Sequence, residues 1–330
     1  MLKKVIITGA NGFIGQHLVE GALQHSMSVF AGVREGSVTH ALQSTKANIT
    51  FLDYENIDKL SQLLVEINPD YIIHNAGLTR TPDYNEFLKV NRDYLVNIVE
   101  AIRLSGIQLE KLLFISSLAA FGPADFQKEG IVTHDSSPHP VTNYGRSKLA
   151  AEMYLKAQTD IPYSIVRPTA VYGPGEKDLF SVFKLINQGI NAMVGYNPQK
   201  LTFIYVKDLV DLILKATIAQ NMHQSYFATD GNIYSALDFP NAIQKSLNKK
   251  VISIKLPVTL IKFIAYLSEK TALITGKFPT LYSERVHEIK ARNWSCDTSN
   301  LQDDLGFKAN YQLEKGIEET VVWYKNNNWF

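Results

Sequence analysis

The stretch KVIITGANGFIG, residues 4–15, decides the fold. Its β-branched run predicts a buried strand, and the pattern that begins at Phe13 predicts a helix. Three glycines at positions 9, 12 and 15 lie between them, which lets the backbone turn tightly and approach a pyrophosphate at a helix N-terminus. The stretch therefore predicts a dinucleotide site. The residues expected along the cofactor here are Gly9, Asn11, Gly12, Phe13, Ile14 and Gly15.

Short β-branched runs alternate with helical patterns through the first half of the chain. The runs begin with VIIT at 5–8 and end with YSIVR at 163–167. This alternation predicts an α/β fold, a Rossmann-type doubly wound parallel sheet, with a smaller, mostly helical C-terminal substrate domain. We expect the Rossmann domain over residues 1–167, with a returning segment near 201–228. The substrate-binding domain is expected over 168–200 and 229–330.

Composition excludes several classes of protein. The chain has 330 residues, 45% of them hydrophobic, with a net charge of +1. This balance gives no electrostatic argument for binding nucleic acid. One cysteine, Cys296, excludes an internal disulfide and argues against a structural zinc site, so no metal is expected. The most apolar later stretch, residues 258–267, is too short for a membrane span and is interpreted as a helix of a core or a substrate pocket.

The second predicted strand ends in GVRE, residues 32–35. An acidic ribose ligand would fall near Val33, but Arg34 follows instead, and a guanidinium suits a 2′-phosphate. This favours NADP(H), while Glu35 keeps NAD(H) open. After the third strand, Asp53 is a candidate contact to the adenine, with Tyr54 beside it; a helix N-cap is the equal alternative for Asp53.

Tyr144 and Lys148 have the spacing of a proton donor and its tuning cation, because a nearby ammonium favours the phenolate. The same spacing occurs at Tyr196/Lys200, Tyr266/Lys270 and Tyr311/Lys315, so spacing alone decides nothing. What distinguishes Tyr144 is its position one helix after a strand that ends in Ser116 and Ser117. Both serines are expected at the sheet edge where ligands bind.

Taken together, the motifs resemble the extended short-chain dehydrogenase/reductase family, also called the NAD-dependent epimerase/dehydratase family. The resemblance covers essentially the whole chain. The motifs that carry it are TGANGFIG at 8–15, HNAG at 74–77, Asn91 in KVNRD, SSLAAFG at 116–122, YGRSK at 144–148, VRPTAVYGPG at 166–175 and IYVKDL at 204–209.

The resemblance implies a role for individual residues. It makes Tyr144 the acid/base, Lys148 its tuner and ribose ligand, and Ser117 the contact to the substrate oxygen. Asn91 is expected near the active-site helix, although it could equally be a helix-stabilising amide. Further cofactor contacts are expected at Ala76, Gly77, Ser116 and Pro168.

Departures from the family pattern narrow the reaction. Dehydratases of the family carry an acidic pair after the catalytic hydroxyl residue, where this chain has Leu118 and Ala119, so dehydration is not expected. Sugar-nucleotide epimerases commonly place Asn and Arg where Ala170 and Leu201 stand, which weighs against a UDP-sugar. The lysines that could substitute are Lys184, Lys200 and Lys207.

The leading hypothesis is an NADP(H)-dependent carbonyl reductase or alcohol dehydrogenase, similar to the dihydroflavonol reductase and hydroxysteroid dehydrogenase branch of the family. An apolar substrate pocket is expected from residues such as Phe180, Phe183, Ile204 and Phe263. The alternative is a nucleotide-sugar epimerase that holds its cofactor tightly. A dinucleotide-sensing protein with a silent site is the third hypothesis.

The remaining expectations concern partners and location. The partner is a small-molecule substrate, with no nucleic acid and no membrane span. The resemblance implies a homodimer through the helices near 84–104 and 143–158. We expect a cytoplasmic protein.

Overall fold

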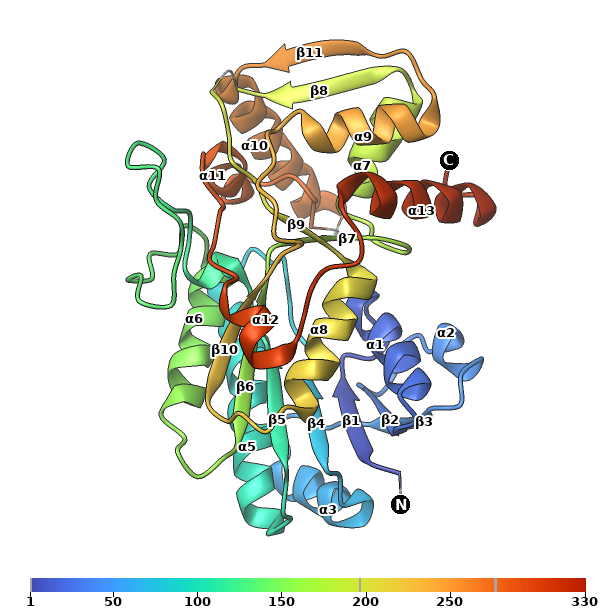
Figure 1. Ribbon diagram of the computed structural model, residues 1–330, viewed down its shortest axis with the longest axis vertical. Coiled ribbons are helices and arrows are strands. Elements are labelled where there is room, and N and C mark those ends of the chain that lie inside the picture. The colour runs from blue at the N-terminus through green and yellow to red at the C-terminus, as the bar shows by residue number, and fades with distance from the viewer. Residues whose placement is uncertain (1, 196, 276–277) are drawn as a thin grey trace.

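The structure is a computed structural model that describes residues 2–195, 197–275 and 278–330. Its centre is a seven-stranded parallel sheet in the order β10-β6-β5-β4-β1-β2-β3 (Figure 1). The sheet strands are β1 (Lys4–Thr8), β2 (Ser28–Val33), β3 (Asn48–Phe51), β4 (Tyr71–His74), β5 (Lys111–Ile115), β6 (Tyr163–Pro168) and β10 (Gln224–Ala228).

This order runs outward in both directions from β1 and β4, as in a Rossmann fold, with β10 added beside β6. The α/β prediction and its doubly wound parallel sheet are confirmed. The carboxyl ends of β1 and β4 are neighbours at the point where the chain changes direction, which is where such sheets bind ligands.

Helices cover both faces of the sheet. Helix α1 (Phe13–Gln24), helix α8 (Val206–Ile218) and helix α12 (Asn300–Leu305) lie on one face, and their buried side chains share a core with the sheet (Figure 1). Helices α3 (Ile57–Ile67), α5 (Tyr94–Ser105) and α6 (Asn143–Lys156) pack on the other face. The short helix α2 (His40–Gln43) precedes β3.

A second region lies beyond the carboxyl ends of the strands, at the upper end of Figure 1. It has its own apolar core, which includes Phe183, Phe239 and Tyr324. Its elements are β7 (Ala170–Tyr172), α7 (Phe180–Asn187), β8 (Ile190–Val194), β9 (Phe203–Tyr205), α9 (Asp238–Leu247), β11 (Ile252–Leu256), α10 (Val258–Thr275), α11 (Arg285–Lys290) and α13 (Leu313–Asn326).

The chain crosses between the two regions more than once. The segment of α8 and β10 joins the sheet region, at the place where the returning segment near 201–228 is expected. The chain also returns to the sheet region a second time, which the sequence does not predict. Leu301 and Phe307 belong to the core under the sheet, while α13 belongs to the other core. The predicted domain boundaries at 167 and 200 stay predictions.

The helix expected over 84–104 is present, but it contains a π-helical turn that the sequence does not predict. The structure divides it into α4 (Tyr84–Leu88), a π-helical turn over Lys89–Asp93 and α5. Such turns are rare inside α-helices and occur frequently at functional sites. The residue turned inward is Asn91, which is fully buried.

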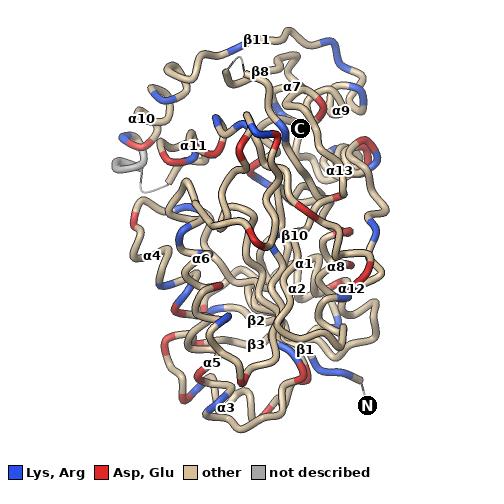
Figure 2. The backbone as a smooth tube through the Cα atoms, turned by 60° about the vertical axis from the view of Figure 1, so that its left-hand side comes forward, with Lys and Arg blue, Asp and Glu red and all other residues tan. Residues whose placement is uncertain are grey.

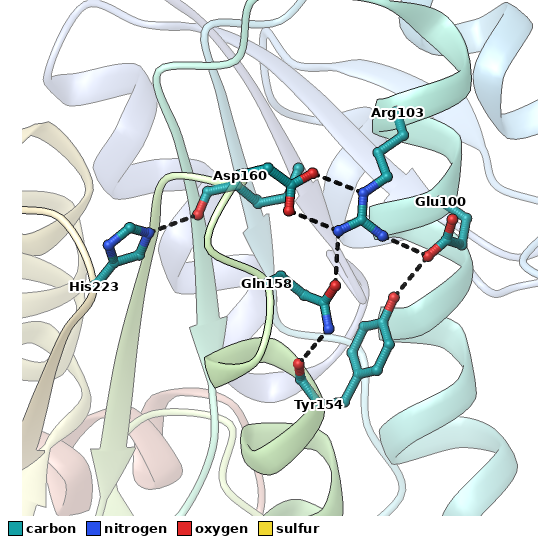
Figure 3. Close-up of polar contacts among 7 residues, drawn as sticks. Glu100, Arg103, Tyr154, Gln158, Asp160 and His223 are labelled. Atoms are coloured by element: carbon teal, nitrogen blue, oxygen red, sulfur yellow. Dashed lines mark hydrogen bonds and ion pairs between the residues drawn. The ribbon is translucent and has the colours of Figure 1, made fainter.

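A polar network lies at the end of the sheet opposite the carboxyl ends of the strands (Figure 3). Arg103 of α5 donates to both carboxylate oxygens of Asp160 at 2.8 Å and to Glu100 at 2.7 Å. Tyr154 of α6 donates to the same Glu100 at 2.9 Å. These groups are partly exposed, so the network links α5, α6 and the loop before β6 but is screened by water.

Within the described part of the chain, no helix combines the length and the apolar character that crossing a bilayer would need.

Candidate active site

The glycine-rich turn after β1 forms a close-packed cradle. An added Cβ on Gly15 would lie 2.2 Å from the carbonyl oxygen of Gly9, so no larger residue fits there without moving the backbone. Helix α1 begins after Gly12, and no side chain caps it. Its first N–H groups therefore present partial positive charge to an incoming phosphate, and the residues fit a dinucleotide.

Thr8 organises the end of β4, a role the sequence did not reveal. Its hydroxyl accepts the N–H groups of Asn75 at 3.1 Å and Ala76 at 3.0 Å. Because both lone pairs are then used, the hydroxyl proton goes to Nδ1 of His74, 2.9 Å away. Burial, and then the charge of Lys148, lowers the pKa of His74 to about 3, so the ring stays neutral. Ala76 is thereby held against the glycine turn.

The adenine end is placed by β2 and β3. Arg34 follows the last residue of β2 and is exposed, with Glu35 beside it. Asp53 is also exposed and pairs with Lys59 at 3.1 Å. The N-cap alternative for Asp53 is wrong, because the side chain of Asn56 caps α3.

Tyr54, in contrast with its exposed neighbour, is buried and stacks on Tyr94 with ring centroids 4.5 Å apart. Its hydroxyl lies close to Thr8 and Gly9, both of which lower its pKa against the larger effect of burial. Tyr54 thus packs beneath the glycine turn.

Ser117 and Tyr144 face each other across the ends of β5 and α6. Ser117 accepts the N–H of Ala119 at 3.1 Å, and its hydrogen bond with Tyr144 opposes the rise in the tyrosine pKa. The close approach depends on Gly145, where a Cβ would lie 2.3 Å from the carbonyl oxygen of Ala119. Thr142 caps α6 by accepting the N–H of Gly145.

The sequence predicts that Lys148 lowers the pKa of Tyr144. In the structure the pKa of Tyr144 is instead raised. Burial raises the pKa of Tyr144 to about 12, and the charge of Glu288 adds to the rise. Burial lowers the pKa of Lys148 to about 8. In the protein alone, Tyr144 is therefore a phenol at neutral pH and able to donate a proton.

Lys148 and Asn91 meet under the turn that follows β4. Lys148 Nζ donates to the carbonyl oxygen of Ile115 at 2.9 Å. A Cβ placed on Gly77 would lie 3.1 Å from Lys148 Nζ and 3.2 Å from Asn91 Oδ1. Asn91 accepts the N–H of Leu78 at 2.8 Å and donates to its carbonyl at 3.0 Å.

Asn91 also donates to Ser147 Oγ at 2.8 Å, which joins the π-helical turn to α6. The structure thus brings Ser117, Tyr144, Lys148 and Asn91 together. All four reach the carboxyl edge of the sheet that carries the glycine turn, where Pro168 ends β6 beside Ala228.

Ser116 is turned away from its neighbour Ser117. Its hydroxyl donates to Glu152 Oε1 at 2.5 Å, so a cofactor contact would have to come from its backbone. Glu152 is fully buried and accepts from Arg167 Nε at 2.9 Å and Nη2 at 2.7 Å. Arg167 lies between the rings of Phe121 and Phe227, at 4.7 and 5.1 Å from their centroids.

Charged residues near Tyr144 come from a segment that the sequence marked only as helical. Arg285 and Glu288 of α11 act on the pKa of Tyr144 in opposite directions. Arg285 and Arg80 both pair with Asp178, at 3.5 and 3.3 Å. The side chain of Thr142 donates to Glu288 at 3.1 Å. No spacing signal links α11 to α6, which lies about 140 residues earlier.

The four side chains expected to line an apolar substrate pocket do not form one. Phe183 and Ile204 are fully buried in two different cores, and Phe180 packs on Tyr324 with centroids 4.8 Å apart. Phe263 is 58% exposed on α10. These side chains do not converge, because an apolar residue by itself does not say which surface covers it.

The other candidate cations and tyrosine–lysine pairs lie elsewhere. Lys207 pairs with Glu319 at 2.6 Å, Lys200 lies over the ring of Phe126, and Lys184 is exposed on α7. Lys270 and Lys315 lie over the rings of their own tyrosines, Tyr266 and Tyr311. The fourth pair includes Tyr196, which is outside the described residues.

Comparisons with known proteins identify the family and agree with the fold. The model of the NAD dependent epimerase/dehydratase family matches residues 5–226. A UDP-glucose 4-epimerase of Vibrio cholerae is 26% identical, covering 99% of this chain and 97% of that protein. A ceramide reductase of Caulobacter vibrioides is 25% identical, covering 98% and 95%. The crystal structure of a UDP-glucose 4-epimerase of Thermotoga maritima superposes with a TM-score of 0.79 at 18% identity, covering 98% and 99%.

Proposed function

This chain belongs to the NAD dependent epimerase/dehydratase family, and we propose that it moves a hydride between NADP(H) and a keto or hydroxy substrate with Tyr144 as acid/base. The observation that carries the proposal is the meeting of Ser117, Tyr144, Lys148 and Asn91 at the edge that holds the glycine turn. When bound, the nicotinamide supplies or accepts the hydride.

The side chains divide the remaining work. Ser117 holds the substrate oxygen, and Tyr144 donates its phenolic proton to that oxygen as the carbonyl becomes an alcohol. The ammonium of Lys148 stabilises the phenolate that is left. Asn91 positions Lys148 by fixing the turn at Leu78 and by its bond to Ser147. Oxidation of an alcohol uses the same atoms in reverse.

Net reduction is our first candidate for the overall reaction. Ser117 and Tyr144 offer two hydroxyl groups to a carbonyl oxygen, and burial keeps the pKa of Tyr144 above its ordinary value. The similarity to a ceramide reductase over 98% of the chain supports it. Leu118 and Ala119 offer no acidic pair, so we propose no dehydration step.

Epimerisation of a nucleotide-linked sugar is the second candidate, supported by a different observation. Arg285 and Arg80 both pair with Asp178, which brings together two guanidinium groups as candidate partners for a diphosphate, and Arg285 is close enough to act on the pKa of Tyr144. These arginines would take the place of the family residues missing at Ala170 and Leu201. The similarity to a UDP-glucose 4-epimerase over 99% of the chain points the same way.

We predict that Arg285→Leu separates the two candidates. If the substrate carries a diphosphate, KM for a UDP-sugar rises about 10- to 100-fold, because a charge-assisted bond is lost. KM for an uncharged ketone stays unchanged. The control is Lys207→Met, whose ammonium is already paired with Glu319 and whose loss should not alter KM. Turnover of UDP-sugars without net NADPH oxidation, in protein that purifies with its cofactor, would reject the reductase.

The preference for NADP is a separate prediction. Arg34→Ala should lower NADPH affinity about 10- to 100-fold and leave NADH affinity nearly unchanged, because only the 2′-phosphate needs the guanidinium. Fluorescence titration of both cofactors measures it. Glu35→Gln is the matched control: a fall in NADH affinity there would assign the ribose to Glu35 instead. Equal affinities in the unmodified protein would refute the preference.

A homodimer remains a proposal that rests on the resemblance, and a cytoplasmic location remains a proposal made by default.

A further inference from the structure

Helix α10 has apolar side chains on the face that it turns to solvent. On its inner side Ile261 and Ala265 pack with Val286 of α11 in a small core. On its outer side lies a row that we name the α10 stripe. The stripe consists of Leu260, Phe263, Ile264 and Leu267, which are 40%, 58%, 41% and 46% exposed.

The spacing of the α10 stripe makes it continuous. Positions i, i+3, i+4 and i+7 fall on one side of a helix and form a single apolar surface. A helix at the surface of a soluble protein ordinarily turns charged or polar groups to water, so an apolar outer face indicates a partner. Tyr266 is also exposed and lies at one edge of the stripe.

The segment of chain that carries the stripe is rich in lysine. Residues 249–271 hold five lysines and one acidic residue, Glu269, which gives a local net charge of +4. The whole chain has a net charge of +1, so the rest of it is negative by three. Blue segments, which are lysines here, mark β11 and α10 in Figure 2, at the end of the molecule away from the N-terminus. The five lysines are all exposed: Lys249, Lys250, Lys255, Lys262 and Lys270.

We propose that β11 and the α10 stripe dock this protein on the surface of an anionic lipid bilayer. The stripe enters the boundary between headgroups and acyl chains, and the lysines keep their ammonium groups among the anionic headgroups. The helix lies in the plane of the membrane. It does not span it.

The charge argues for a bilayer over a second copy of the chain. A twofold dimer would place this patch against itself, and the exposed lysines of each copy would then repel those of the other. An anionic surface instead attracts all five. The proposal does not depend on which reaction the site performs.

The test is co-sedimentation of the full chain with lipid vesicles. We expect binding to vesicles of phosphatidylcholine with about 30% phosphatidylglycerol, and little binding to phosphatidylcholine alone. About 0.5 M NaCl should release most of the protein, because surface attraction is then screened over a few ångströms. Equal binding to both vesicle types, or none, would overturn the proposal.

Two sets of variants test the named side chains. Phe263→Ser with Leu267→Ser should weaken vesicle binding at least about tenfold, since it removes apolar groups from the boundary. Phe51→Ser is the matched control, because Phe51 is 60% exposed on β3 and should not affect binding. Lys255→Gln with Lys262→Gln should weaken binding and flatten its salt dependence. Circular dichroism confirms that each variant is folded.

Sedimentation velocity tests the alternative that a second copy of the chain covers the α10 stripe. If the stripe variant converts an oligomer into a smaller species while vesicle binding is unchanged, the face belongs to a second copy and the proposal fails. An unchanged sedimentation coefficient together with lost vesicle binding supports it.

Discussion

Replacement of Tyr144 by Phe is expected to lower kcat by about 10²- to 10⁴-fold, the usual contribution of a positioned acid/base. The hydroxyl is the only group removed, and the ring should keep its contact with Phe87, at 6.2 Å between centroids. Cofactor affinity should stay within about twofold, since the glycine turn and Lys148 are untouched. Stopped-flow or steady-state assays at 340 nm measure kcat, and a parallel cofactor titration measures the affinity.

The chain offers its own control for this experiment. Tyr266→Phe removes the same hydroxyl from another tyrosine that lies four residues before a lysine, but Tyr266 is exposed on α10. Its kcat should equal that of the unmodified protein. If Tyr144→Phe retained full activity toward every substrate that the unmodified protein turns over, the assignment of the acid/base would be wrong.

Glu152→Ala should cost about 3 to 5 kcal/mol in the free energy of unfolding, because it leaves the guanidinium of Arg167 buried without a counter-charge. The side-chain exposures of the two partners are 0% and 1%. One nitrogen, Arg167 Nη1, already has no partner among the described residues, so little else can compensate. Urea unfolding, followed by circular dichroism, measures the loss.

Two further variants isolate the cause. Arg103→Ala breaks the exposed network of Figure 3 and should cost less than about 1 kcal/mol per ion pair removed. Glu152→Leu with Arg167→Met removes both buried charges and should recover most of the stability lost in Glu152→Ala. A loss below about 1 kcal/mol in Glu152→Ala would mean that water reaches the pair.

Much of the fold followed from local patterns. Val5–Thr8 with the glycines after it predicted β1, the turn and α1, because each of these depends on residues close in sequence. The π-helical turn at 89–93 was not predicted, and the bonds that Asn91 makes within it go to Leu78 and Ser147, which are distant in sequence. The same holds for α12, whose Leu301 and Phe307 look like any apolar pair until the sheet covers them.

The candidate site also contains residues that sequence spacing predicts and residues that only the packing of distant segments brings in. Tyr144 and Lys148 share one turn of helix, so their spacing could be read directly. Arg285 and Glu288 lie about 140 residues further on and reach Tyr144 only through the packing of α11 against the start of α6. Phe263 was expected in a pocket and lies in solvent, because hydrophobicity does not specify direction.

The sequence by itself determined the alternation of strands and helices from which the sheet was predicted, the glycine turn and the tyrosine–lysine spacing, because each is encoded by residues that lie close together in the chain. Only the tertiary structure decided that Ser116 bonds to the buried pair of Glu152 and Arg167, and that the α10 stripe faces outward. These outcomes depend on contacts between distant segments. Their free energies come from burial and desolvation, which no local pattern records.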